Sequence, residues 1–204
     1  PNTQLTLLDY PGIPMKIENR NLPMKSGVKA MDQFRGIREG FALNCEGGAF
    51  IGLRGGGWIY DRDGKRVRQF PGDGGGKHVA NFIAAIRTHR TADLNAPIAE
   101  AHISSAVCHL GNVSWRLGRP APGPACREAV GAHSEAAETL SLLESHLAAN
   151  GLNLSQNPFH LGPWLEPDAA ADSIRAVVGG DAAMLASARS LAHGTYRSPY
   201  DFSS

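Results

Sequence analysis

Three polar side chains recur along one helical stretch of the sequence and could bind a hydroxyl-rich ligand. His102 and His109 are seven residues apart, which places them near one helix face, and Asn112 follows almost one turn later. Imidazole and carboxamide groups both donate and accept hydrogen bonds, so this stripe could line a pocket for a polyol. The alternative is that each histidine is a structural residue at a boundary between sheet and helix. As candidate substrate-binding residues we take His102, His109 and Asn112, and we identify no catalytic residue.

The other reactive side chains do not form a recognised catalytic or metal-binding pattern. Of the acidic residues only Glu100 lies close in sequence to the histidines, so the spacing offers no convincing third ligand for zinc. Cys108 directly precedes His109, and neighbouring helical residues point about 100° apart, which argues against a Cys–His pair. The GxSxG and HExxH patterns are absent. We expect no metal site.

The glycine-rich residues 72–78 have the composition of a phosphate-binding loop but not its spacing. GxxxxGK[ST] would need glycine where Pro71 stands and serine or threonine where His78 stands. The glycines at 47–48 and 55–57 are not followed by helical patterns, as a dinucleotide-binding fingerprint requires. We therefore expect no cofactor site and no Rossmann domain in this chain.

Composition excludes several classes of partner. The 204 residues carry 20 basic and 19 acidic side chains, so no strong field would attract nucleic acid or an anionic membrane. Apolar runs are far shorter than the roughly 20 residues that span a bilayer, and the N-terminus has no signal pattern. Cys45, Cys108 and Cys126 fit neither a disulfide framework nor a zinc site. We expect a soluble protein with no nucleic-acid or membrane partner. The composition is compatible with either a cytoplasmic or an exported protein.

Short-period patterns predict that residues 1–70 are mainly strands. Pro11 and Gly12 form a turn between predicted strands at 5–10 and 15–20, which gives a hairpin. Four further runs, near 41–45, 49–53, 57–60 and 66–70, are separated by turns rich in glycine and aspartate. This pattern predicts an antiparallel meander in which residues 63–64 form the sharpest turn.

After residue 76 the apolar residues recur at helical spacing. This period predicts helices over about 77–90 and 97–118, which we expect to be the two core helices of the segment 77–119. A third helix is predicted from about 125 to 149, ended by Asn150 and Gly151. We expect the remainder of 120–204 to wrap the core as a helical and irregular tail, with helical runs near 174–178 and 181–191 and an end at 196–200.

Strands first and helices afterwards indicate an α+β domain. We expect one domain over 1–204 with a mostly antiparallel sheet and helices packed on one face. Several predicted strands are apolar on both sides, so the other face also needs cover. A second copy of the chain could supply it, which predicts a homo-oligomer through the sheet face.

Several stretches of the chain carry a resemblance to a known family. HVANFIAAIR at 78–87, NAPIAEAH at 95–102 and SAVCHLGNVSWRLGR at 105–119 resemble the C-terminal domain of the glucose-fructose oxidoreductase / inositol dehydrogenase (Gfo/Idh/MocA) family. GWIYDRDG at 57–64 and LGPWLE at 161–166 resemble one bacterial branch of that family. The stretches occur in the family's order, and the resemblance covers most of the chain.

This resemblance implies an NAD- or NADP-dependent oxidoreductase that acts on a sugar or cyclitol. In the family, a Rossmann domain binds the cofactor, and the C-terminal domain supplies the substrate pocket and the oligomer interface. The cofactor fingerprint and the Glu-Lys-Pro motif of the first domain have no match in this sequence. We therefore expect a substrate-binding and oligomerisation domain that does not transfer hydride without a Rossmann half.

Two alternatives stay open at the level of sequence. The chain could be a stand-alone, non-catalytic module that binds sugar or dimerises. It could also have reused the pocket for cofactor-free sugar chemistry, although the sequence offers no carboxylate pair or metal site for that reaction.

Overall fold

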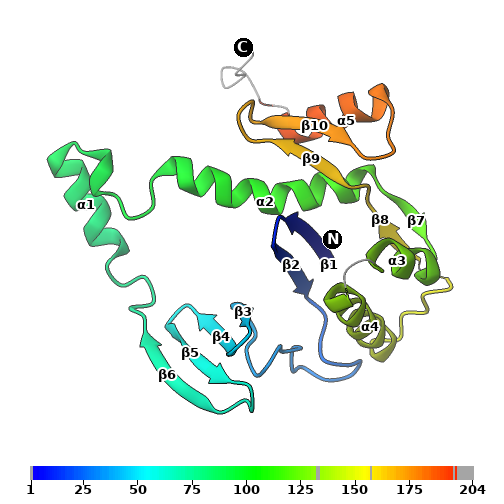
Figure 1. Cartoon of the computed structure of the whole chain (residues 1–204), viewed down its shortest axis with the longest axis horizontal. Helices are drawn as coiled ribbons and strands as arrows, with labels where there is room; N and C mark the ends of the chain where they lie inside the picture. Colours follow the sequence, from blue (N-terminus) through cyan, green and yellow to red (C-terminus); the bar gives the residue numbers. More distant parts are fainter. Residues whose placement is uncertain (1, 132–133, 157, 195, 197–204) are drawn as a thin grey trace. The chain divides into compact units, whose positions relative to one another are not determined.

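A computed structural model describes residues 2–131, 134–156, 158–194 and 196 (Figure 1). It contains helices and strands, and every strand pairing in it is antiparallel. This confirms the predicted α+β class with antiparallel sheet. The chain divides into two compact units, the first from residues 1–28 and 102–204 and the second from 29–101. The sequence predicts a single domain over 1–204, because periodicity finds the elements but not which of them pack together.

The first unit begins with the predicted hairpin. β1 (Thr3–Tyr10) and β2 (Ile13–Arg20) pair along their full length. Gly12 forms the turn with φ of +78°, a conformation that glycine adopts without steric cost. Leu7 of β1 lies opposite Lys16 of β2, so these two side chains share one face of the hairpin.

Two helices replace the single third helix predicted over 125–149. They are α3 (Gly123–Val130) and α4 (Ser134–Ala149). Gly131 follows the last residue of α3, and glycine costs about 1 kcal/mol relative to alanine inside a helix. The predicted end of the segment is confirmed, because Gly151 adopts φ of +77° just after α4.

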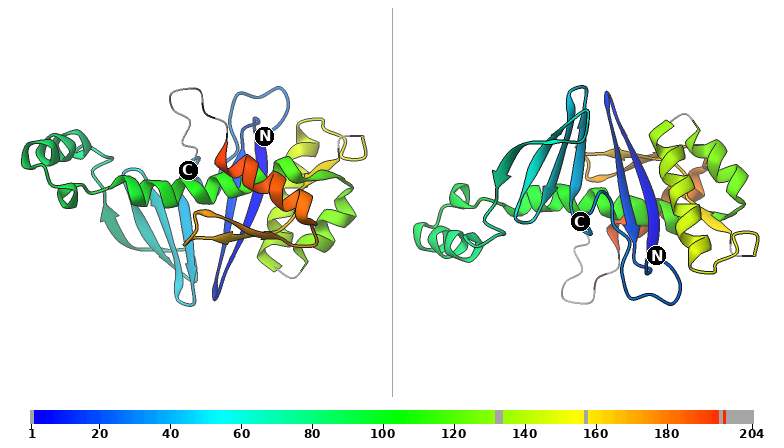
Figure 2. Two further views of the ribbon diagram at one scale, coloured as in Figure 1. Left: turned by 90° about the horizontal axis from the view of Figure 1, so that it is seen from above. Right: turned by 90° about the horizontal axis from the view of Figure 1, so that it is seen from below.

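The segment 120–204 supplies much of the core of the first unit, where the sequence predicts a wrapping tail. Its remaining elements are β7 (Arg119–Ala121), β8 (Phe159–Leu161), β9 (Leu165–Asp168), β10 (Ser173–Val177) and α5 (Ala182–His193). One buried cluster joins Val113 of α2 to Ile174, Val177 and Ala188, so β10 and α5 pack beside that helix (Figure 2). A second buried cluster consists of Cys126, Val130, Ala136 and Leu140 of α3 and α4.

The predicted helical run near 174–178 is wrong. Residues 173–177 form β10, which pairs with β9. Ile174 and Val177 have the β-branched side chains that favour strands, and Ile174 is only 1% exposed. The predicted helix at 181–191 is confirmed as α5, whose N-cap is Asp181. Most of the predicted tail end at 196–200 lies outside the described residues.

The second unit contains the predicted meander. β3 (Phe41–Cys45), β4 (Gly48–Leu53), β5 (Gly56–Asp61) and β6 (Arg66–Pro71) form one sheet in that order. The sharp turn at 63–64 is confirmed by Gly64, with φ of +77°. The strands of the described chain form four separate sheets, of which this is the largest.

Helix α1 (His78–Thr88) is amphipathic as predicted, but it is not a core helix. A short helix, η1 (Thr91–Asp93), follows it. Ala85 of α1 is buried, whereas Val79, Phe82 and Ile86 are each more than half exposed. The period of apolar residues identifies the apolar face of a helix, but not what covers that face.

Helix α2 (Ile98–Leu117) begins in the second unit and continues into the first. Its buried residues, Gly111 and Val113, lie in the first unit, whereas Ile98 and Ile103 are largely exposed. Among the described residues, none of the helices has both the length and the apolar character needed to cross a bilayer.

Candidate functional site

The structure separates the three predicted site residues. His102 Nε2 lies 3.0 Å from Asp172 Oδ1, in the turn between β9 and β10. Both side chains are more than half exposed, and His102 is not among the residues that line either hollow described below. His109 and Asn112, in contrast, line the same hollow in the first unit.

This polar hollow has a volume of about 390 Å³ and lies between α2 and α5. Its lining residues are His109, Asn112, Val113, Trp115, Arg116, Leu191 and Ala192. Arg116 is a lining residue that the sequence reasoning missed. It follows Asn112 by four residues, and this i,i+4 spacing on the predicted helix could have identified it.

The polar groups of the hollow suit hydroxyl recognition. Arg116 offers several N–H donors, while His109 and Asn112 each offer donor and acceptor atoms. None of the residues described as lining the hollow carries a carboxylate. Within the described residues, no three His, Cys, Asp or Glu side chains form a group that could hold a metal ion.

In the glycine-rich segment 72–78, two backbone N–H groups already bind a carboxylate of the chain. The Asp73 carboxylate accepts hydrogen bonds from the backbone N–H groups of Gly75 at 2.9 Å and Lys77 at 3.3 Å. These two bonds, that of Gly75 first, hold the pKa of Asp73 below its ordinary value. An anion would therefore have to compete with a carboxylate of the chain itself.

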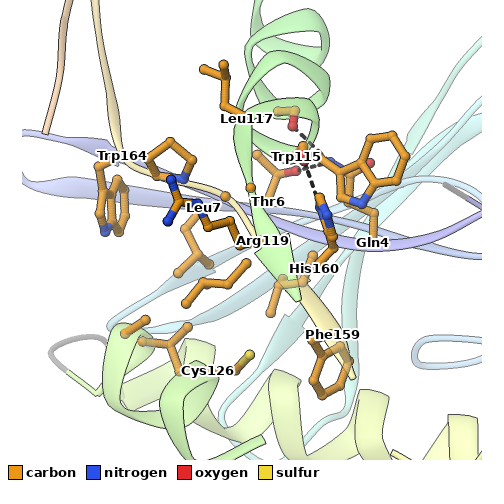
Figure 3. A pocket seen from close by; sticks show the side chains of 18 of the residues that line it. Gln4, Thr6, Leu7, Trp115, Leu117, Arg119, Cys126, Phe159, His160 and Trp164 are labelled. Atoms are coloured by element: carbon orange, nitrogen blue, oxygen red, sulfur yellow. Dashed lines mark hydrogen bonds between the residues drawn. The ribbon is translucent and has the colours of Figure 1, made fainter. Parts of the chain in front are cut away.

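A second, larger cavity of about 520 Å³ lies wholly within the first unit (Figure 3). It is mostly apolar, and its walls come from β1, α2, α3, α4, β7, β8, the segment after β8 and the start of α5 with the residue after β10. Its lining residues include Leu5, Leu7, Trp115, Arg119, Cys126, Ala129, Leu140, Leu143, Phe159, His160, Trp164 and Val178. This cavity has no counterpart among the predictions from sequence.

Strand β1 forms one wall because its two faces contact different helices. Gln4 Nε2 donates to the Gly111 carbonyl oxygen of α2 at 3.2 Å and to Thr6 Oγ1 at 3.1 Å. Leu5 and Leu7 point the other way and pack against the buried cluster of α3 and α4. The period of two in a strand thus places a polar and an apolar row on opposite sides of β1.

Two glycines allow the end of α2 to approach the segment after β8. A Cβ atom on Gly118 would lie 2.6 Å from the Leu161 carbonyl oxygen, and one on Gly162 would lie 2.5 Å from backbone atoms of Ser114. The Ser114 hydroxyl donates to the Pro163 carbonyl oxygen at 2.8 Å. These contacts fix the rim of the cavity beside Trp164.

Two basic side chains supply polar atoms to this cavity. Arg119 begins β7, and the part of the chain that the structure describes gives its guanidinium no hydrogen bond or ion pair. His160 of β8 donates from Nδ1 to the Trp115 carbonyl oxygen at 2.9 Å, and its ring lies 5.4 Å from the Trp115 ring (Figure 3). Because a carbonyl only accepts, the proton of neutral His160 is on Nδ1 and Nε2 is an acceptor.

Cys126 lies at the apolar end of the cavity, as Figure 3 shows. It is 4% exposed, and burial raises the pKa of its thiol. Cys45 and Cys108 are exposed. A thiol with a raised pKa is a poor nucleophile at neutral pH, so Cys126 acts as an apolar wall residue.

Comparisons of the chain with protein families, with curated proteins and with solved structures found no match.

Proposed function

We propose that the chain is the substrate-binding and oligomerisation domain of an NAD- or NADP-dependent oxidoreductase that acts on a sugar or cyclitol. The proposal rests on the sequence resemblance to the Gfo/Idh/MocA family together with the α+β fold. On this proposal, the cofactor is bound by a Rossmann half that the chain itself does not supply.

The observation that carries the substrate class is the polar hollow beside α2. His109, Asn112 and Arg116 present donors and acceptors from successive turns of one helix, and Trp115 provides an aromatic surface. A sugar or cyclitol presents hydroxyl groups on a ring whose C–H faces are apolar. This hollow, lined by both polar and apolar side chains, matches that chemistry.

The four-stranded sheet supports a role in oligomerisation. The strand register places Phe41, Leu43, Phe50, Ile59 and Phe70 on one face, together with Arg68, whose guanidinium lies over the Phe70 ring. The Phe50 ring lies 5.8 Å from that of Phe41 and 5.9 Å from that of Phe70. Phe41 and Leu43 are each 54% exposed. An apolar sheet face of this kind is suited to pairing with the same face of a second copy.

Titration calorimetry of the chain with a panel of cyclitols and aldoses, and separately with NADH and NADPH, tests the proposal. We expect at least one polyol to bind and neither nucleotide to bind. Asn112→Leu should weaken polyol binding at least tenfold, because it removes a donor and an acceptor. Cys108→Ser changes a neighbouring exposed residue that does not line the hollow, and it should have no effect.

Two results would contradict the proposal. One is the absence of polyol binding across the panel, or binding that Asn112→Leu leaves unchanged. The other is micromolar NADH binding, which would require a nucleotide site within this chain. A reading frame that continues upstream into a Rossmann domain would favour the oxidoreductase over a stand-alone sugar-binding module, and a natural start codon at this boundary would favour the module.

A further inference from the structure

We propose that the larger cavity of the first unit binds a small monocarboxylate with an apolar body, such as a medium-chain fatty acid. This site differs from the polar hollow and does not depend on the proposed oxidoreductase function. Trp115 contributes to the lining of both, so the two sites adjoin at α2.

The apolar body of the proposed ligand follows from the apolar walls of the cavity. The part of the cavity nearest α3 and α4 is formed by aliphatic and aromatic side chains, including Leu5, Leu7, Leu140, Leu143 and Phe159. The volume of about 520 Å³ lies within the roughly 300–1,000 Å³ of small-molecule sites. An alkyl chain that enters this space leaves water and contacts only apolar groups there, which favours binding.

The negative charge of the proposed ligand follows from the polar side chains that line the cavity. Arg119 and His160 are the basic residues of the lining, and none of the lining residues that the structure describes is Asp or Glu. Arg119 carries a permanent positive charge that no described carboxylate neutralises. A planar carboxylate can accept two parallel hydrogen bonds from its guanidinium.

A single permanent cation makes one carboxylate a better match than a phosphate. Among the described lining residues, Arg119 is the one side chain with a permanent positive charge. The second charge of a phosphate would have no second permanent cation in the described lining. Nε2 of His160 makes no hydrogen bond to the described residues and could accept one from a ligand hydroxyl or from water.

Trp115 and Trp164 line the cavity and can report on its occupancy, whereas Trp58 lies on β5 in the second unit. The experiment therefore uses the full chain with Trp58→Phe and follows tryptophan fluorescence and calorimetry. The probes are octanoate, octanol, which has the same body without charge, and acetate, which has the charge without the body. We expect saturable binding of one octanoate per chain, at least ten times tighter than octanol, and no binding of acetate.

Substitutions test separately how the charge of Arg119 and the free volume of the cavity contribute to binding. Arg119→Met should weaken octanoate at least tenfold and leave octanol unchanged, and Arg119→Lys should restore part of the affinity. Arg116→Met removes an arginine of the same region that lines only the polar hollow, and it should leave octanoate binding unchanged. Ala129→Phe fills the cavity and should abolish binding of both probes.

Circular dichroism and the melting temperature show whether each variant is folded. If Ala129→Phe does not fold, Val178→Phe, at a lining position that is 54% exposed, should weaken both probes instead. The proposal is overturned if octanoate does not bind saturably or if octanol binds equally well. It is also overturned if Arg119→Met, or a folded variant that fills the cavity, leaves octanoate binding unchanged. Because polyol binding to the hollow is measured separately, failure here leaves the proposed function intact.

Discussion

Gly111 of α2 lies directly against Thr6 of β1. A Cβ atom at position 111 would be 2.7 Å from Thr6 Oγ1 and 2.9 Å from Thr6 Cγ2. Gly111 is also buried, and its carbonyl oxygen accepts a hydrogen bond from Gln4. The missing side chain at 111 therefore sets how closely the strand approaches the helix, and with it one wall of the cavity.

Gly111→Ala should destabilise the chain although alanine is the better helix former. Alanine gains about 1 kcal/mol in helix propensity, whereas crowding in a packed interior costs about 1–3 kcal/mol. Thr6 cannot relieve the crowding by rotating, because both branches of its side chain lie within 3 Å of the new atom. Urea denaturation should show a net loss of stability.

Thr6→Ala provides the matched control for that substitution. The double variant Thr6→Ala/Gly111→Ala should be more stable than the sum of the two single effects predicts, by about 0.5–3 kcal/mol. Additive effects would mean that the two residues do not limit the approach of β1 to α2.

Asp181 should stabilise the start of α5. Its Oδ1 accepts a hydrogen bond from the Met184 backbone N–H at 2.8 Å, the contact of a helix N-cap. Asp181→Ala should lower the free energy of unfolding by about 0.5–2 kcal/mol, and Asp181→Asn should retain most of it. Equal losses in the two variants, measured by urea denaturation, would rule out the cap as the cause.

Cys126 should be much less reactive than the other two cysteines. Cys45 and Cys108 are exposed, whereas burial raises the pKa of the Cys126 thiol. A disulfide reagent added to the native protein at neutral pH should modify two thiols rapidly and the third slowly, with all three reacting in denaturant. Peptide mapping that places the slow thiol at Cys45 or Cys108 would contradict the described burial.

Acid should loosen the end of α1 only at low pH. The Arg90 side chain, and then the Thr88 hydroxyl, hold the pKa of Asp93 below its ordinary value of 3.8. A carboxyl whose folded pKa is depressed adds stability above the unfolded pKa, and that stability is lost as pH falls through the folded pKa. The protection of amides near residue 88, measured relative to their intrinsic exchange rate at each pH, should therefore stay constant above about pH 5 and fall below about pH 4.

Asp93→Asn is the control for this titration. The variant should exchange faster than the native chain at neutral pH and lose most of the acid dependence near residue 88. If the acid dependence of the native chain persists in Asp93→Asn, another group is responsible for it.

The apolar face of the four-stranded sheet should tolerate charge poorly if it pairs two copies. Leu43 is 54% exposed on that face, and the next residue, Asn44, is exposed on the opposite face. Light scattering should show that Leu43→Arg lowers the oligomer mass and Asn44→Arg does not. A native chain that is monomeric at all accessible concentrations would contradict pairing through this face.

Local sequence patterns determined most elements of this protein. The hairpin at 3–20, the four strands of the meander, α1, α2 and α5 follow from periods of two or 3.6 residues and from turn residues such as Gly12 and Gly64. The strand at 173–177 was missed, because a short apolar run fits a helix and a strand equally well. Pairing with β9 decides its form.

In the candidate site, too, sequence spacing predicts one part and tertiary structure decides the other. The closeness of His109, Asn112 and Arg116 is a property of one helix, so spacing alone can predict it. The exposed position of His102 and its contact with Asp172 depend on a turn seventy residues away.

The larger cavity was decided by tertiary structure alone. Its lining joins β1 at the N-terminus to residues near 120, 140 and 160. Periodic patterns extend over one helix or strand, so they cannot predict contacts between segments this far apart in the sequence. Close approach at Gly111 and Gly162, where a side chain would collide with its neighbours, brings these segments together. The sequence determines which faces are apolar, and packing between distant segments decides which of those faces enclose a space.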